Sequence, residues 1–193
     1  PGSREQRRRG HDARGDREGV GRGQARGVGG TALMLFDEVA CSWKLDADGR
    51  DWLAWAARVH EIGLAIADSH HQRHGAYILR HADLAGFSRQ EQELLAAVVE
   101  LHRRKPDKSV VSALPLRYRA LARQITALLR LAVLFRRARR AESLPRMQLS
   151  ASSKSLRLKL PAAWFEQHPP TEADLPQEKA PMAELGVKLD ISS

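Results

Sequence analysis

The chain has 193 residues, a hydrophobic content of 42% and a formal net charge of +9 at pH 7. This length allows one or two domains, and the hydrophobic content is sufficient for a buried core. No apolar run approaches the roughly 20 residues that span a membrane, and no signal-peptide pattern opens the sequence. The basic balance favours a polyanionic partner such as nucleic acid, polyphosphate, a nucleotide or an anionic surface.

Cysteine usage gives a first indication of compartment. Cys41 is the single cysteine of the chain, so no internal disulfide can form. This favours a reducing compartment, and we expect a cytoplasmic protein. Cys41 lies in a helical pattern, which predicts a buried structural thiol.

Residues 1–30 differ in composition from the rest. They hold eight arginines, four acidic residues, nine of the fourteen glycines and almost no apolar residue. Such a segment cannot bury enough surface to offset its ordering entropy, which predicts disorder. Two alternatives remain: an RNA-binding tail, and out-of-frame translation upstream of a domain that starts near Thr31.

Apolar residues recur at the helical period along most of residues 31–143. Ser88 followed by Glu91 has the spacing of a capping box, so a helix is expected to start there. A basic loop with Pro106 follows that helix. The pattern predicts a mainly α bundle with helices over residues 31–45, 50–68, 73–81, from Ser88 onward, and 116–142.

The pattern changes after residue 143. Residues 147–150 and 156–160 alternate at period two, which predicts a β-hairpin. Short helices over 161–167 and 177–185 and a last strand over 187–191 complete a small α/β module with an antiparallel sheet. The expected domains are therefore a disordered segment (1–30), a helical domain (31–143) and a small α/β domain (144–193).

Histidines gather between Arg58 and Phe87. Five of the eight histidines of the chain lie in this stretch. Imidazole groups at this density indicate a metal or phosphate site, or the remains of one. The five are His60, His70, His71, His74 and His81.

The same stretch carries the motifs His60-Glu61-Ile62-Gly63, Arg73-His74-Gly75-Ala76-Tyr77-Ile78-Leu79, Asp83-Leu84 and Gly86-Phe87-Ser88. Together they resemble the C-terminal half of the exopolyphosphatase/guanosine-pentaphosphatase family. The resemblance rests on an ordered set of short motifs and runs from about Thr31 to the end of the chain. It implies an HD-like helical module and a small α/β module, and the family places an ATPase-like catalytic half before them.

The resemblance also implies a binding role, because the helical module of the family helps to line a channel for long polyphosphate. Arginine suits phosphate oxygens through paired hydrogen bonds. Asp68 lies near this turn and would repel phosphate. The residues that we expect to bind polyphosphate are Arg73, His74, Arg103, Arg104 and Lys105.

Active HD-type chemistry needs histidine and aspartate ligands around a divalent metal. Here the central pair is His60-Glu61, no early histidine lies between Thr31 and Leu45, and Val133 stands where an aspartate is expected. We therefore expect no bound metal and no catalytic residue. His60, Glu61 and His102 are interpreted as the remnant of a metal or phosphate site, with His60 and His102 as hydrogen-bonded core histidines.

Three hypotheses follow. In the first, the chain is a polyphosphate-binding and dimerising region of an exopolyphosphatase that hydrolyses terminal phosphate from polyphosphate or guanosine pentaphosphate. The isolated chain would then be inactive, because the catalytic half, whose cofactor is expected to be Mg²⁺, is not in this sequence. The second is an HD-type metal-dependent phosphohydrolase, and the third is a nucleic-acid-binding protein.

Overall fold

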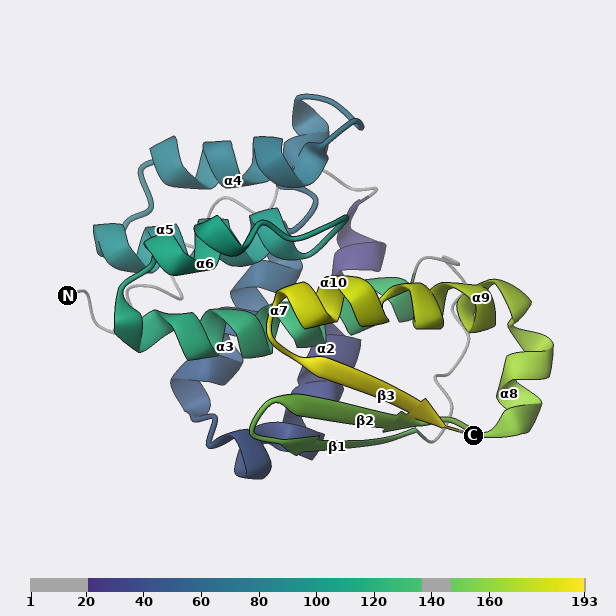
Figure 1. Cartoon of the computed structure of the whole chain (residues 1–193). Coiled ribbons are helices and arrows are strands. Elements are labelled where there is room, and N and C mark those ends of the chain that lie inside the picture. The colour runs from purple at the N-terminus through teal and green to yellow at the C-terminus, as the bar shows by residue number, and fades with distance from the viewer. Residues whose placement is uncertain (1–20, 137–146, 193) are drawn as a thin grey trace.

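The computed structural model describes residues 21–136 and 147–192. Most of them are helical, and a three-stranded sheet lies near the C-terminus (Figure 1). This confirms the expected mainly α chain with a small α/β module. The helical part consists of α2 (Gly21–Trp43), α3 (Ala47–Val59), the 3₁₀ turn η1 (Ile62–Ala65), α4 (His71–His81), α5 (Arg89–Leu101), α6 (Lys108–Ala113) and α7 (Leu116–Arg136).

The C-terminal part contains β1 (Gln148–Ser152), β2 (Ser155–Lys159), α8 (Ala162–Gln167), α9 (Pro169–Gln177), α10 (Lys179–Glu184) and β3 (Lys188–Ser192). The hairpin β1–β2 is antiparallel, as expected. β3 pairs with β2 in parallel, so the sheet is mixed and not antiparallel throughout. The difference arises because α8–α10 carry the chain back across the sheet before β3 begins, which is the connection that a parallel pair requires.

The first helix begins earlier than expected. Residues 21–30, which were assigned to the disordered segment, form the first turns of α2, and Val28 is fully buried. Thr31 donates a hydrogen bond to the Gly27 carbonyl at 3.0 Å, and Arg136 donates to the Thr31 hydroxyl at 2.9 Å. The prediction was wrong for these ten residues because packing against α7 outweighs the low helix propensity of glycine. Residues 1–20 lie outside the described part.

Local signals set several helix ends. The Ser88 hydroxyl accepts a hydrogen bond from the Glu91 amide, and the Glu91 carboxylate accepts one from the Ser88 amide, which confirms the capping box. Asp46 caps α3 in the same way, accepting from the Gly49 amide at 2.8 Å. α3 ends at Val59, earlier than the expected residue 68. Gly63 packs against the backbone of α4, where a Cβ would meet the His71 carbonyl oxygen at 1.9 Å.

One hydrophobic cluster joins the helices to the sheet. It includes Leu35, Leu128 and Leu129 from the bundle together with Leu156 and Leu158 from the hairpin. A hydrogen bond also links the two parts, since the indole Nε1 of Trp43 donates to the Ser152 carbonyl at 2.6 Å. The expected division of the chain after residue 143 stays a prediction, since that boundary lies outside the described residues.

Two further features of the described residues differ from expectation or extend it. Cys41 is exposed, so the prediction of a buried thiol was wrong. It faces away from the side of α2 that buries Leu35, Phe36, Val39 and Trp43. No helix of the described ranges is both long and apolar enough to cross a membrane.

Candidate functional site

The start of α4 and the loop after α5 meet in the folded chain. The Arg103 guanidinium donates from Nη1 to Nδ1 of His71 across 3.3 Å, although the two residues are 32 positions apart. The pKa of the Asp107 carboxyl is lowered by hydrogen bonds from Ser109 and also by the positive charge of Arg73. The two segments predicted to carry the polyanion site are therefore neighbours in space.

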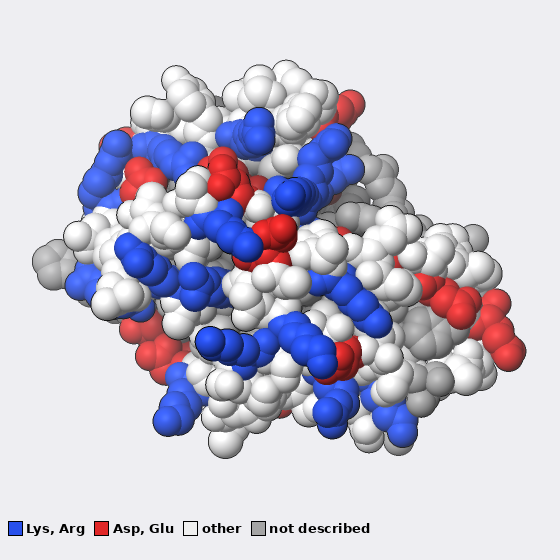
Figure 2. Space-filling view, in the orientation of Figure 1, with Lys and Arg blue, Asp and Glu red and all other residues white. Residues whose placement is uncertain are grey.

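The five predicted binding residues differ in their exposure. Arg73, Arg104 and Lys105 are exposed, whereas His74 and Arg103 are half-buried. Lys105 Nζ lies 3.9 Å from a Glu184 oxygen, which draws this lysine toward α10. Figure 2 shows lysine and arginine side chains over the start of α4 and the loop after α5, with further basic groups across the same face and acidic side chains between them. The positive charge of this face is thus spread over several separate groups of lysine and arginine side chains.

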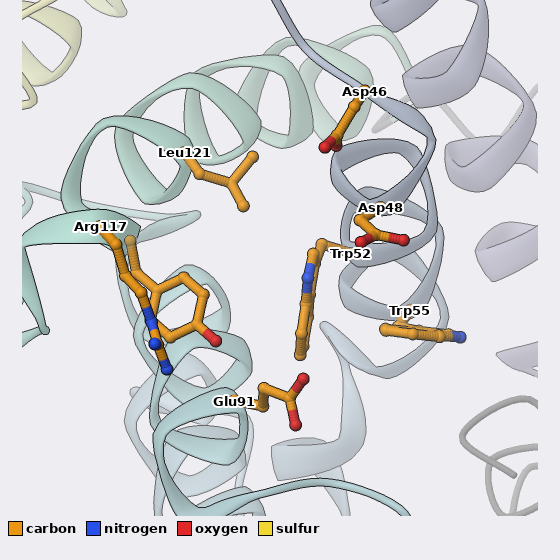
Figure 3. Close-up of a pocket in the computed structure, with 8 residues that line it drawn as sticks. Asp46, Asp48, Trp52, Trp55, Glu91, Arg117 and Leu121 are labelled. Carbon is orange, nitrogen blue, oxygen red and sulfur yellow. The ribbon is translucent and has the colours of Figure 1, made fainter. Parts of the chain in front are cut away.

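The described cavities lie elsewhere. One, of about 230 Å³, is formed by the first turns of α3, α5 and α7. Figure 3 shows Trp52 and Leu121 on opposite sides of it, with the Glu91 carboxylate below the Trp52 ring and the Trp55 ring turned away. Two of its carboxylates, Asp46 and Glu91, are the helix caps described above. Helix capping therefore explains the position of these two carboxylates.

A second cavity lies between α5 and the segment that leads into α7. Its lining includes Arg80, which pairs with Glu93 at 3.1 Å and with Glu100 at 2.7 Å. None of the five predicted binding residues lines either cavity. The candidate site is accordingly an open basic surface beside α4.

Beneath this surface lies a group of three histidines, which we call the histidine joint: His60, His71 and His102. The His102 ring lies 5.4 Å from the His60 ring and 5.8 Å from the His71 ring, measured between centroids. The three come from the end of α3, the start of α4 and the end of α5, and all are buried. Sequence analysis predicted His60 and His102 as core residues but did not place His71 with them.

The hydrogen bonds of the joint confirm the core interpretation of His60 and His102. Nδ1 of His60 lies 2.8 Å from the Ala57 carbonyl, and Nδ1 of His102 lies 2.5 Å from the Val99 carbonyl. Because a carbonyl only accepts, each Nδ1 carries a proton in these contacts and each Nε2 has a lone pair. Among the residues that the structure describes, none forms a hydrogen bond with the buried Nε2 of His60.

Burial favours the neutral form of all three rings. Desolvation lowers the pKa of His60 and of His71, and it lowers the pKa of His102 furthest, with the neighbouring His60 adding to the effect. One carboxylate oxygen of Glu61 lies 3.9 Å from Nε2 of His60. This arrangement stabilises uncharged imidazole, which neither donates two protons to phosphate nor attracts it electrostatically.

The donor set gives no metal centre within the described ranges. There, no group of three or more His, Cys, Asp or Glu side chains is placed to hold a metal ion.

A buried ion pair lies next to the joint. Arg130 donates from Nε to Glu178 at 2.8 Å and from Nη1 to the Leu101 carbonyl at 2.9 Å. Its positive charge contributes to the low pKa of His102, after burial and His60. Arginine recurs along α7, at Arg117, Arg119, Arg123, Arg130 and Arg136, and such a pattern predicts a solvated face. The signal that was missed is the apolar run on both sides of it, since residues 125–132 are all buried.

A comparison with protein-family models gives one match over most of the chain. The model described as "Ppx/GppA phosphatase, domain III" matches residues 15–179. The matched range includes all five predicted binding residues, the histidine joint and the Arg130–Glu178 pair. It begins before Thr31, in agreement with the early start of α2.

Proposed function

The chain belongs to the Ppx/GppA phosphatase family, in the part described as domain III, and from this we propose that it is a polyanion-binding module of a phosphate-releasing enzyme. In the complete protein the reaction is hydrolysis of terminal phosphate from inorganic polyphosphate or from guanosine pentaphosphate. The module itself holds the polyphosphate chain. Catalysis belongs to the ATPase-like half that the family places before it.

One observation carries this proposal. The contact between Arg103 and His71 brings the loop after α5 against the first turn of α4. Arg73 and Arg104 are exposed on these two segments. A linear polyanion that crosses this surface meets cations from both segments, and each contact releases counterions.

Binding of long inorganic polyphosphate to the full chain tests the proposal. Replacing Arg73 and Arg104 by alanine removes two positive charges from the candidate surface. The matched control replaces Arg157 and Lys159, which are exposed on β2, and it removes the same charge. Both variants keep the arginines of residues 1–30, so their contribution cancels in the comparison.

We expect the Arg73/Arg104 variant to lose roughly fivefold in affinity for each arginine, since one charge-assisted contact is worth about 1 kcal/mol. The control should lose less, and affinity should fall steeply with salt in all three proteins. Equal losses in the two variants would show a diffuse basic surface without a defined site. Binding of single-stranded RNA in preference to polyphosphate would favour a nucleic-acid-binding function.

Self-association is the second part of the proposed role. Apolar side chains are exposed on η1 and α4, with Ile66 54% and Tyr77 61% accessible. A homodimer that covers this face would remove them from water. Sedimentation of the chain and of the Ile66→Lys variant tests this, with a monomeric wild-type chain as the contrary result.

A further inference from the structure

Nδ1 of His71 has both a donor and an acceptor near it. Nη1 of Arg103 is 3.3 Å from it, and the carbonyl oxygen of Asp68 is 3.4 Å from it. A guanidinium is always a donor and a carbonyl is always an acceptor. The ring nitrogen can therefore satisfy only one of them at a time, and its protonation state decides which.

A neutral ring with its proton on Nε2 satisfies Arg103. Nδ1 then carries the lone pair that accepts from the guanidinium, whereas a neutral ring with its proton on Nδ1 would donate to Asp68 instead. His60 and His102 have the opposite tautomer, because each donates from Nδ1 to a backbone carbonyl. With the proton of His71 on Nε2, the joint holds both tautomers of neutral histidine.

We infer that His71 is a proton-operated positioning residue. Protonation at Nδ1 ends its contact with Arg103 and replaces it with a hydrogen bond to the Asp68 carbonyl. No backbone rearrangement is needed, since the acceptor is already beside the ring. The proton comes from solvent, and the imidazolium then carries one proton on each nitrogen.

The groups around His71 determine whether its neutral or its charged form is favoured. Burial lowers its pKa, and among the charges around it Arg103 lowers the pKa further whereas Glu61 and Asp68 raise it. His102, at the end of α5, faces it as a neutral ring that is itself beside His60 and Arg130. The helix that carries His71, α4, adds Arg73 and His74 two and three residues after it. The neutral form therefore dominates at pH 7, and acidification or a nearby anion favours the charged form.

A polyanion provides such an anion. This consequence rests on the polyphosphate surface proposed above. Polyphosphate bound there favours release of the Arg103 guanidinium from His71. It also favours the charged form of His71. Binding is then linked to proton uptake by this one residue, and by reciprocity lower pH strengthens binding.

The switch itself is tested without any ligand by ¹⁵N NMR of the histidine rings in the full chain. At pH 8, His71 should be the Nε2–H tautomer, and His60 and His102 should be Nδ1–H tautomers. On acidification, the Arg103 guanidinium signals should move with the same midpoint as the His71 ring. A neutral His71 protonated on Nδ1, or Arg103 signals that ignore the His71 titration, would overturn the inference.

The linkage is tested by polyphosphate affinity at pH 7.5 and pH 5.5 at constant ionic strength. His71→Gln keeps an acceptor for Arg103 but cannot be protonated, and His81→Gln on the exposed end of α4 is the control for general histidine charge. The gain in affinity at pH 5.5 should be about two- to fivefold larger in the wild-type chain and in His81→Gln than in His71→Gln. An equal gain in all three proteins overturns the linkage, whereas absence of binding in all three refutes the proposed function and leaves the NMR result to decide the switch.

Discussion

Arg130 of α7 and Glu178, between α9 and α10, form an ion pair inside the protein, with 2.8 Å between Nε and Oε2 and side-chain exposures of 2% and 11%. The pair connects the helical bundle to the segment that covers the sheet. Removal of one partner leaves a buried charge, which costs about 3–5 kcal/mol. Glu178→Ala should therefore lower the free energy of unfolding by about that amount in urea denaturation.

A matched comparison separates this buried pair from charge in general. Glu184→Ala removes a partly exposed carboxylate that pairs with the exposed Lys108 at 2.8 Å, and it should leave the unfolding midpoint almost unchanged. The double variant Arg130→Met/Glu178→Met should recover most of the loss, because it leaves no charge unpaired. Similar midpoints for the Glu178 and Glu184 variants would contradict the buried role of the pair.

Gly63 should tolerate no side chain. Its Cβ would stand 1.9 Å from the His71 carbonyl oxygen and 2.5 Å from the Gly75 amide. Gly63→Ala must push η1 away from α4, so we expect a loss of stability and a shift of the His71 ring signals. Gly30→Ala is the control, because nothing lies within 4 Å of its Cβ position in α2. That substitution should stabilise the chain by about 0.5–1 kcal/mol.

Stability should depend on pH through the histidine joint. The pKa values of His60 and His102 are lowered in the folded state, so their stabilising effect is complete above the ordinary histidine pKa of about 6.5. It is lost as the pH falls below that value, because the unfolded chain then binds protons that the folded chain does not. Each histidine contributes a slope of about 1.4 kcal/mol per pH unit.

Urea denaturation at pH 7.5 and pH 5.5 measures this slope. His102→Gln removes one group that binds a proton more readily in the unfolded chain than in the folded chain. The free energy of unfolding should therefore change less with pH, although the substitution lowers stability at pH 7.5. His81→Gln, outside the joint, should keep the wild-type slope. A wild-type midpoint that does not change between the two pH values would contradict neutral burial of the joint.

Val28 should contribute to stability as a core residue. It is fully buried in α2, whereas Met34 on the same helix is 37% exposed. Val28→Ala should cost about 1–3 kcal/mol, and Met34→Ala should cost little. The same reasoning predicts that a chain starting at Gly21 is more stable than one starting at Thr31, which thermal denaturation of the two truncated proteins can check.

Purified protein should contain no stoichiometric metal. The basis is the sequence, in which Glu61 stands in the central pair and Val133 replaces an expected aspartate. Elemental analysis of protein prepared without chelator is the measurement. One or two equivalents of manganese, iron or zinc would contradict the prediction and support an HD-type enzyme.

Features that depend on neighbours in sequence could be predicted from the sequence. The Ser88–Glu91 capping box needs only residues three apart, and the β1–β2 hairpin needs only its own alternation. The binding residues could be assigned only through the family resemblance, and the structure adds that the two segments that carry them are neighbours.

Features that depend on distant residues could not be predicted. Arg130 is buried because Glu178, 48 positions away, reaches it, and no periodicity reports such a partner. His71 lies beside His102 where η1 packs closely against the start of α4, an approach that the missing Cβ of Gly63 permits. Helix α9 was missed because Pro169, Pro170 and Pro176 suggest a loop, although a proline in the first turn of a helix costs no hydrogen bond.

The parallel pairing of β3 with β2 has a consequence for the order of folding. The β1–β2 hairpin joins neighbouring segments, and such hairpins form in about 1–10 μs. β3 must wait until residues 160–187 have crossed the sheet, and the closure of such a long connection slows its pairing. Pulse-labelled amides of β3 should thus become protected later than those of β1, and the moment at which Lys188 pairs with Ser155 marks completion of the sheet.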